Sequence, residues 1–245
     1  MTALLALHGF TGSPRSWQFL PAAPNQLRFV PALVGHLDSD AGSDVVDFES
    51  EVDRLARLVG EAGSVHAVGY SLGARLALGL AARHPTRVSR LTLISAHPGL
   101  ESDAERDQRR VADERWCELL LSRGALAFVD AWQAQPLWAS QARLDRATLD
   151  QKRRERLSHD PAGLVRSLRV TGLSQMPNYR DALARLRVPV TLIAGGLDEK
   201  FRALAQQMAR TAPHAELTIV DGAGHDLLLE RPELITDLIR RGNQP

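Results

Sequence analysis

Short, unbroken apolar runs recur along the chain, and segments with helical spacing separate them. The runs cover residues 3–7, 29–34, 65–70, 88–95, 188–194 and 215–220. Intervening segments such as Asp47–Ala62, with Val52, Leu55 and Val59 at helical spacing, predict helices, and others are expected near 72–83, 201–212 and 234–241. Strands buried on both faces are apolar throughout, so this alternation predicts an α/β fold with a mostly parallel sheet and helices on both faces.

The pattern changes between residues 101 and 186, where strand-like runs give way to charged helical sequence. Three of the four tryptophans lie here, and residues 101–160 hold eleven Lys+Arg against twelve Asp+Glu, so most of these arginines are expected on solvated, ion-paired faces. We therefore expect a core of residues 1–96 and 187–245 and an inserted helical cap of residues 97–186. A cap over the carboxyl ends of the strands is where an α/β enzyme binds its ligand.

Composition narrows the classes of partner. The net charge of +1 over 245 residues gives no electrostatic case for nucleic acid. The single cysteine, Cys117, excludes an internal disulfide and a cysteine-cluster metal site, and it is expected to be a small buried hydrophobe. We expect a cytoplasmic protein without an integral membrane segment, because the first residues hold no basic leader and Ala3–Leu7 is too short to cross a bilayer.

The run at residues 65–70 ends in the Gly-x-Ser-x-Gly motif Gly69-Tyr70-Ser71-Leu72-Gly73. A strand, a sharp turn and a helix are typical of this motif, with a strained serine at the tip of the turn and with glycines where a Cβ would collide with a neighbouring strand or helix. The amides at the helix N-terminus favour negative charge near the serine. This arrangement suits acyl or enolate chemistry, although the motif alone also fits a turn serine that only caps a helix.

The first apolar run is followed by the glycine-rich segment His8-Gly9-Phe10-Thr11-Gly12-Ser13. In folds with the Gly-x-Ser-x-Gly motif, a His-Gly turn after an early strand supplies one amide of an oxyanion hole. We expect the N–H groups of Phe10 and Leu72 to form it here. A phosphate-binding loop is disfavoured because neither Gly-Lys-Ser/Thr nor Gly-x-Gly-x-x-Gly is present.

An acidic residue and a histidine follow late strands, in the chain order of a Ser-His-Asp triad. Asp198 comes just after the run at 188–194, and His225 follows the run at 215–220. His225 would take the Ser71 proton, and Asp198 would fix the imidazole tautomer. Alternatives remain open: Asp198 could cap the next helix, Asp221 could be the acid, and His8 or His97 could be the base.

A resemblance covers nearly the whole chain. The segments that carry it are Leu7–Ser13, the motif around Ser71 with Arg75 four residues later, His97–Leu100, Arg109-Arg110 with Asp113 and Trp116, Ala131–Pro136, Gly195–Phe201 and Gly222–His225. The chain is similar in these segments to the 2-succinyl-6-hydroxy-2,4-cyclohexadiene-1-carboxylate (SHCHC) synthase family of menaquinone biosynthesis, which has the α/β-hydrolase fold. The resemblance implies a cofactor-independent and metal-independent carbon–oxygen lyase that eliminates pyruvate from a cyclohexene substrate with three carboxylates.

The resemblance also implies roles for individual residues. Arg75 and Arg109 match carboxylate-binding arginines of the family, and Arg156 matches less closely because a short gap is needed. Tyr70 and Trp132 fall on substrate-binding positions. The triad would then remove the proton beside the succinyl ketone without an acyl-enzyme. The substrate is a small molecule, and a monomer is the favoured oligomeric state.

Two other functions remain open at this point. A serine hydrolase, either a carboxylesterase or a C–C bond hydrolase, would use the same triad through an acyl-enzyme on a small carboxylate-bearing substrate. A non-catalytic binding protein with the same fold is disfavoured, because the chain keeps all three triad residue types.

Overall fold

The central element is a parallel β-sheet. The structure, a computed structural model, describes residues 3–21, 26–37 and 43–241. Within these ranges six strands form one sheet, and each strand is parallel to its neighbours. Their spatial order is β2 (Arg28–Phe29), β1 (Ala3–Leu7), β3 (Val65–Tyr70), β4 (Val88–Ile94), β5 (Val190–Gly195) and β6 (Ala215–Val220). The α/β fold expected from the apolar runs is confirmed.

The second strand is shorter than the sequence pattern predicts. The apolar run at 29–34 suggests a strand over that range, whereas β2 spans only Arg28–Phe29. Pro31 lies two residues after the end of β2, and proline has no N–H to donate to a neighbouring strand. The run is still partly used for burial, because Leu33 and Val34 are fully buried.

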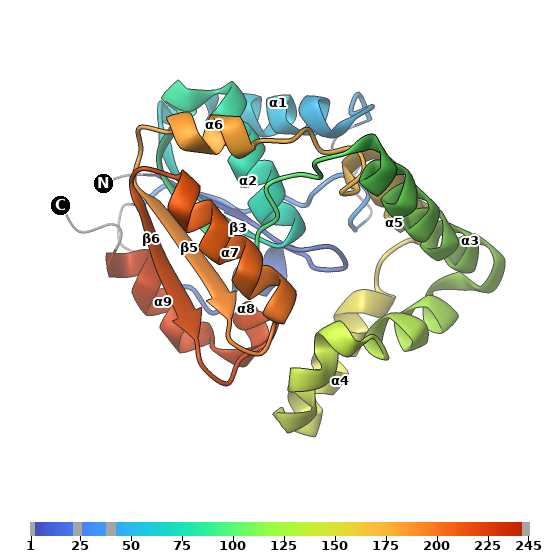
Figure 1. The fold of residues 1–245 in the computed structure, drawn as a ribbon. Helices are drawn as coiled ribbons and strands as arrows, with labels where there is room; N and C mark the ends of the chain where they lie inside the picture. The colour runs from blue at the N-terminus through green and yellow to red at the C-terminus, as the bar shows by residue number, and fades with distance from the viewer. Residues whose placement is uncertain (1–2, 22–25, 38–42, 242–245) are drawn as a thin grey trace.

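Helices cover both faces of the sheet (Figure 1). One face packs against α1 (Phe48–Leu58), α2 (Leu72–Arg83), α6 (Arg180–Arg185) and α7 (Glu199–Thr211), and the other packs against η1 (Pro14–Trp17), α8 (Leu227–Glu230) and α9 (Pro232–Arg241). Side chains alternate along β1, so that Leu5 and Leu7 join the first apolar cluster while Leu4 and Ala6 join the second. Burial on both sides explains why the strands are apolar throughout.

The segment between β4 and β5 is helical, and most of it lies to one side of the layered core (Figure 1, green to yellow). It comprises α3 (Asp103–Gln133), η4 (Pro136–Arg143), α4 (Arg146–Leu157) and α5 (Pro161–Thr171), followed by α6. Its own apolar cluster joins α3 to α5. Gly124, at a φ of 73°, bends α3.

The cap boundaries at residues 97 and 186 stay a prediction. Inside them, Leu173, Met176 and Leu183 pack in the large cluster under the sheet rather than with α3 and α5. Along the described stretches of chain, no helix combines the length and the apolar character needed to span a membrane.

Candidate active site

The turn between β3 and α2 holds Ser71 at its tip. Ser71 has φ 52° and ψ −106°, a conformation that non-glycine residues seldom adopt. A Cβ on Gly69 would lie 2.2 Å from the carbonyl oxygen of Gly73, and a Cβ on Gly73 would lie 2.1 Å from that of Leu7. The expectation that both glycines are needed for close backbone approach is confirmed, and the tight turn directs Ser71 away from the sheet.

Ser71, His225 and Asp198 form a hydrogen-bonded chain. His225 Nε2 lies 3.1 Å from Ser71 Oγ, and His225 Nδ1 lies 2.6 Å from Asp198 Oδ2. Asp198 also accepts the N–H of Phe201 at 3.3 Å, so it caps α7 and orients the histidine at the same time. The three residues meet because β3, β5 and β6 bring their carboxyl ends to one edge of the sheet.

The alternative acid and bases occupy other positions. Asp221 is exposed to solvent. His97 Nδ1 accepts the Gly99 N–H at 3.1 Å, and burial together with Lys200 and Arg75 lowers the pKa of His97 to about 3. His8 binds backbone groups through both ring nitrogens, and burial lowers its pKa to about 4. A histidine with so low a pKa is too weak a base to accept a proton from a hydroxyl at neutral pH.

The two expected oxyanion residues both border the cavity at Ser71. Leu72 is the first residue of α2, and Phe10 lies in the loop after β1. In that loop Thr11 has a positive φ of 61°, and its N–H donates to His36 Nε2 at 3.2 Å. Gly9 leaves room for the ring of Tyr70, whose Cε1 would lie 2.7 Å from a Cβ at that position.

A cavity of about 340 Å³ opens next to Ser71 and is bounded by both the core and the cap. Its polar and charged lining consists of Tyr70, Ser71, Arg75, His97, Arg109, Asp113, Gln135, Ser167, Thr171, Lys200 and His225. Its apolar lining includes Phe10, Trp116, Trp132, Trp138 and Phe201. An apolar cavity with a few polar groups at defined places is typical of a small-molecule site.

Arg75 and Arg109 lie together in this cavity. Arg109 Nε donates to both carboxylate oxygens of Asp113 at 2.9 Å, one turn further along α3. Arg75 Nη1 donates to the carbonyl oxygen of Thr171 at 2.9 Å, and no described carboxylate forms an ion pair with it. Burial and the charge of Arg109 lower the pKa of Arg75 to about 9, so it remains a cation at neutral pH that an anionic ligand would stabilise.

Sequence reasoning assigned no role to two further charged residues of the cavity. Lys200 borders the cavity in the first turn of α7, and burial and the charge of Arg109 lower the pKa of Lys200. Asp113 is buried and holds Arg109 in place. The four-residue spacing of Arg109 and Asp113 on a predicted helix was a signal for the second of these.

Aromatic rings from both the cap and the core surround the cavity. The Trp132 ring stacks on Phe128 with centroids 5.5 Å apart and meets Phe10 edge-on at 5.3 Å. Trp138 and Phe201 approach the His225 ring at 5.6 and 4.4 Å. Aromatic rings therefore cover part of the His225 ring, which is 2% exposed.

Arg156 and Tyr70 meet in a narrower space beside this cavity. Arg156 is 1% exposed and lies over the Trp138 ring at 5.0 Å, and among the described residues its Nε has no hydrogen-bond partner. Tyr70 and Trp138 border both spaces, whereas Arg156 borders only the narrow one. Its predicted role as a carboxylate ligand therefore remains a prediction that requires Trp138 or Tyr70 to move.

The described side chains do not form a recognisable metal site. Over the described ranges, no group of three or more His, Cys, Asp or Glu residues is placed to hold a metal ion. Cys117 is buried and unpaired by any disulfide, as its isolation in the sequence predicts.

Comparisons with known proteins agree with this architecture. The model of the Alpha/beta hydrolase family matches residues 4–238. An SHCHC synthase of Salmonella heidelberg is 31% identical over 240 residues, which are 96% of this chain and 91% of that protein. A Bacillus subtilis protein that carries the same name provisionally is 35% identical over 97% of this chain and 88% of its own length.

Solved structures give the same result. The structure of MenH from S. aureus superposes with a TM-score of 0.91 at 29% identity and covers 98% of this chain and 92% of that chain. A thermophilic esterase from Thermogutta terrifontis superposes with a TM-score of 0.83 at 24% identity, covers 98% of this chain and 89% of its own, and supports the fold alone. The chain therefore belongs to the α/β hydrolase family and, within it, to the SHCHC synthases.

Proposed function

We propose that this protein eliminates pyruvate from 2-succinyl-5-enolpyruvyl-6-hydroxy-3-cyclohexene-1-carboxylate to give SHCHC, a step of menaquinone biosynthesis. The observation that carries the proposal is the cavity in which Ser71, hydrogen-bonded to His225, faces the same space as Arg75 and Arg109. A serine hydrolase needs the pair of Ser71 and His225 but not the two arginines. A substrate with three carboxylates accounts for the pair and for the arginines.

The proposed reaction starts at the ring carbon that carries the succinyl ketone. His225 accepts the Ser71 proton while Ser71 Oγ removes the proton from that carbon, directly or by relay. The electron pair delocalises onto the ketone oxygen, and the amides of Phe10 and Leu72 stabilise the resulting enolate. The electron pair then returns from the ketone oxygen, shifts the ring double bond and breaks the bond between the ring carbon and the enolpyruvyl oxygen. The leaving group is the enolate of pyruvate, which becomes pyruvate after protonation.

Asp198 is proposed to orient His225 and to stabilise the imidazolium. Its carboxylate lies 2.6 Å from Nδ1, so the proton on that nitrogen leaves Nε2 free to accept from Ser71. The enclosure of His225 by Trp138 and Phe201 strengthens this charge interaction by excluding water. No step requires a cofactor or a covalent intermediate.

Recognition of the substrate is assigned to cations and aromatic rings of the cavity. The guanidinium groups of Arg75 and Arg109 suit carboxylates because they donate two parallel hydrogen bonds. Lys200 adds a third cation to the cavity lining, and Trp132, which borders the same cavity, is proposed to contact the ring of the substrate. Tyr70 already borders the cavity, whereas Arg156 would join the site only after movement of Trp138 or Tyr70.

The direct test is to supply the enolpyruvyl cyclohexene substrate and to follow pyruvate with a coupled lactate dehydrogenase assay. We expect catalytic turnover that saturates with substrate. The serine-hydrolase alternative predicts instead a burst with an activated ester and rapid ester turnover. Ester turnover without pyruvate release above background would replace the lyase proposal with the hydrolase.

A further inference from the structure

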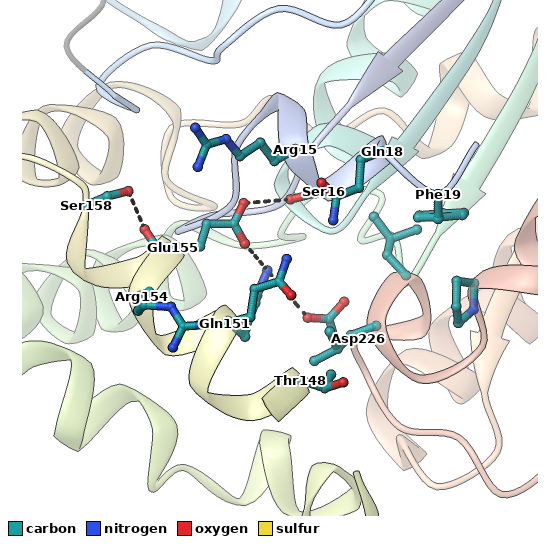
Figure 2. A pocket seen from close by; sticks show the side chains of 14 residues that line it. Arg15, Ser16, Gln18, Phe19, Thr148, Gln151, Arg154, Glu155, Ser158 and Asp226 are labelled. Carbon is teal, nitrogen blue, oxygen red and sulfur yellow. Dashed lines mark hydrogen bonds and ion pairs between the residues drawn. The ribbon is translucent and has the colours of Figure 1, made fainter. Parts of the chain in front are cut away.

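The joint between α4 and the core lies next to the loop that carries the Phe10 amide. A cavity of about 450 Å³ borders this joint, and Figure 2 shows Glu155 of α4 directed toward Ser16 of η1, with Asp226 nearby. Lys152 Nζ lies 3.0 Å from Glu155 and 3.8 Å from Asp226, the neighbour of His225. Because these charges pair with one another, we regard the joint as a connection between cap and core rather than as a ligand site.

Glu155 makes its shortest contact with the loop after β1. Ser13 Oγ donates to Glu155 Oε1 at 2.5 Å, and Ser16 Oγ donates to the same oxygen at 3.3 Å. Ser13 is 1% exposed and follows Phe10 by three residues. Hydrogen bonds from a hydroxyl to an ionised carboxylate are among the stronger ones in proteins. The cap therefore holds the loop at a point close to the proposed oxyanion amide.

The loop needs such restraint because its backbone is strained. Thr11, between Phe10 and Ser13, has a φ of 61°, which costs a non-glycine residue about 1–2 kcal/mol. His36 holds the Thr11 N–H from the core side at 3.2 Å. Glu155 holds Ser13 from the cap side. The amide of Phe10 lies just before the segment that these two contacts restrain.

We propose that Glu155 is a positioning residue, which acts through Ser13 to keep the Phe10 N–H aimed at the developing oxyanion. The inference rests on the proposed oxyanion role of Phe10. Glu155 itself borders the α4 joint and not the Ser71 cavity, so it acts without touching the substrate. Desolvation raises the pKa of Glu155, but Lys152 and the Ser13 hydroxyl outweigh it and keep the pKa below its ordinary value, so the acceptor stays ionised at neutral pH.

The test compares kcat and KM of Glu155→Ala, Glu155→Gln and Ser13→Ala. Loss of an oxyanion donor costs about 10²–10³ in rate, and a misplaced one costs part of that. We expect Glu155→Ala and Ser13→Ala each to lower kcat by about 10- to 100-fold, with KM changed by less than about threefold. Glu155→Gln keeps an acceptor oxygen for Ser13 and should recover most of kcat.

The double variant and a matched control separate positioning from general destabilisation. Glu155→Ala combined with Ser13→Ala should lower kcat little further than either alone, because both remove the hydrogen bond between Ser13 and Glu155. Asp150→Ala, on the same helix and paired with exposed Arg146, should leave kcat unchanged. A fall in kcat for Glu155→Ala with additive loss in the double variant, or with equal loss in Asp150→Ala, overturns the proposal.

A second readout is independent of the lyase reaction. The rate at which a fluorophosphonate labels Ser71 depends on the same oxyanion hole, and we expect it to fall in Glu155→Ala and Ser13→Ala but not in Asp150→Ala. If the wild type releases no pyruvate yet labelling slows in these variants, the lyase proposal fails and the positioning role stands. Unchanged kcat and unchanged labelling in both variants overturn the positioning role, as does a wild type inert in both assays.

Discussion

The core side and the cap side of the site are built in different ways. On the core side, backbone topology places Ser71, Asp198 and His225, because each follows a strand of one parallel sheet. On the cap side, side-chain contacts place the ligand-facing groups: Asp113 holds Arg109, and ring stacking holds Trp132. The proposed chemistry of the core side therefore rests on a rigid frame, whereas the proposed recognition by the cap side can change without altering the sheet.

This difference explains how one fold serves both esterases and SHCHC synthases. A hydroxyl–imidazole–carboxylate chain with nearby amides suits any reaction that develops negative charge on a carbonyl oxygen. The cap then decides which molecule reaches it. In this chain the cap side contributes Arg109 and aromatic rings, and the core contributes Arg75 to the same cavity, which is the arrangement that we propose for an anionic ring compound.

The largest expected effect concerns the core side. Ser71→Ala removes the group proposed to take the proton, and loss of a triad residue costs about 10⁴-fold or more in kcat. Substrate binding should persist, because Arg75 and Arg109 remain, and quenching of the cavity tryptophans would report it. Ser89→Ala, at the start of β4 and outside the cavity, is the matched control and should keep full turnover. Retained turnover in Ser71→Ala contradicts the proposed mechanism.

The next effect separates the two arginines. Arg75→Ala and Arg109→Ala should each lower kcat/KM by about 10²-fold or more, since truncating a buried charge pair costs about 2–5 kcal/mol. Only Arg109→Ala should also lower the melting temperature, because it leaves the buried Asp113 carboxylate without its partner. Arg109→Ala with Asp113→Asn should restore stability but not activity.

Arg110 provides the control for this pair. It neighbours Arg109 in sequence but is exposed and pairs with Asp107 at the surface. Surface pairs contribute about 0–1 kcal/mol, so Arg110→Ala should change neither kinetics nor stability measurably. Equal kinetic effects of Arg109→Ala and Arg110→Ala would mean that Arg109 does not bind substrate and is a solvated surface residue, as the charge balance predicts for most cap arginines.

The sequence predicted the core side of the site better than the cap side. The apolar runs predicted β1 and β6 to the residue and the start of β3, and the glycine motif predicted the backbone approach of Gly69 and Gly73, because these features depend on local sequence. Helix α8 was missed, since four residues are too few for a periodic pattern. The burial of Arg156 against Trp138 and the link from Glu155 to Ser13 join residues far apart in the chain, and no local pattern encodes them.

The last expected effect is on stability rather than on turnover, at the contact between core and cap. His8, His36 and His159 form a row of rings with centroids 4.9 and 5.3 Å apart, and His159 accepts the Leu37 N–H. Burial lowers the pKa of all three below the ordinary 6.5, to about 4 for His8. The folded protein therefore keeps these rings neutral, while the unfolded chain protonates them below pH 6.5.

Because the unfolded state binds more protons, the free energy of unfolding should be independent of these histidines above pH 6.5 and should fall as the pH drops toward about 4. Each ring contributes a slope of at most about 1.4 kcal/mol per pH unit, reached where its unfolded form is protonated and its folded form is still neutral. Urea unfolding at pH 7.5, 6, 5.5 and 5 measures this, and His159→Gln should reduce the slope by about one ring's share. A free energy of unfolding that does not change between pH 6.5 and 5 would mean that these histidines become protonated in the folded protein as well. The contact between cap and core would then depend on the charges around Glu155 rather than on neutral histidine rings.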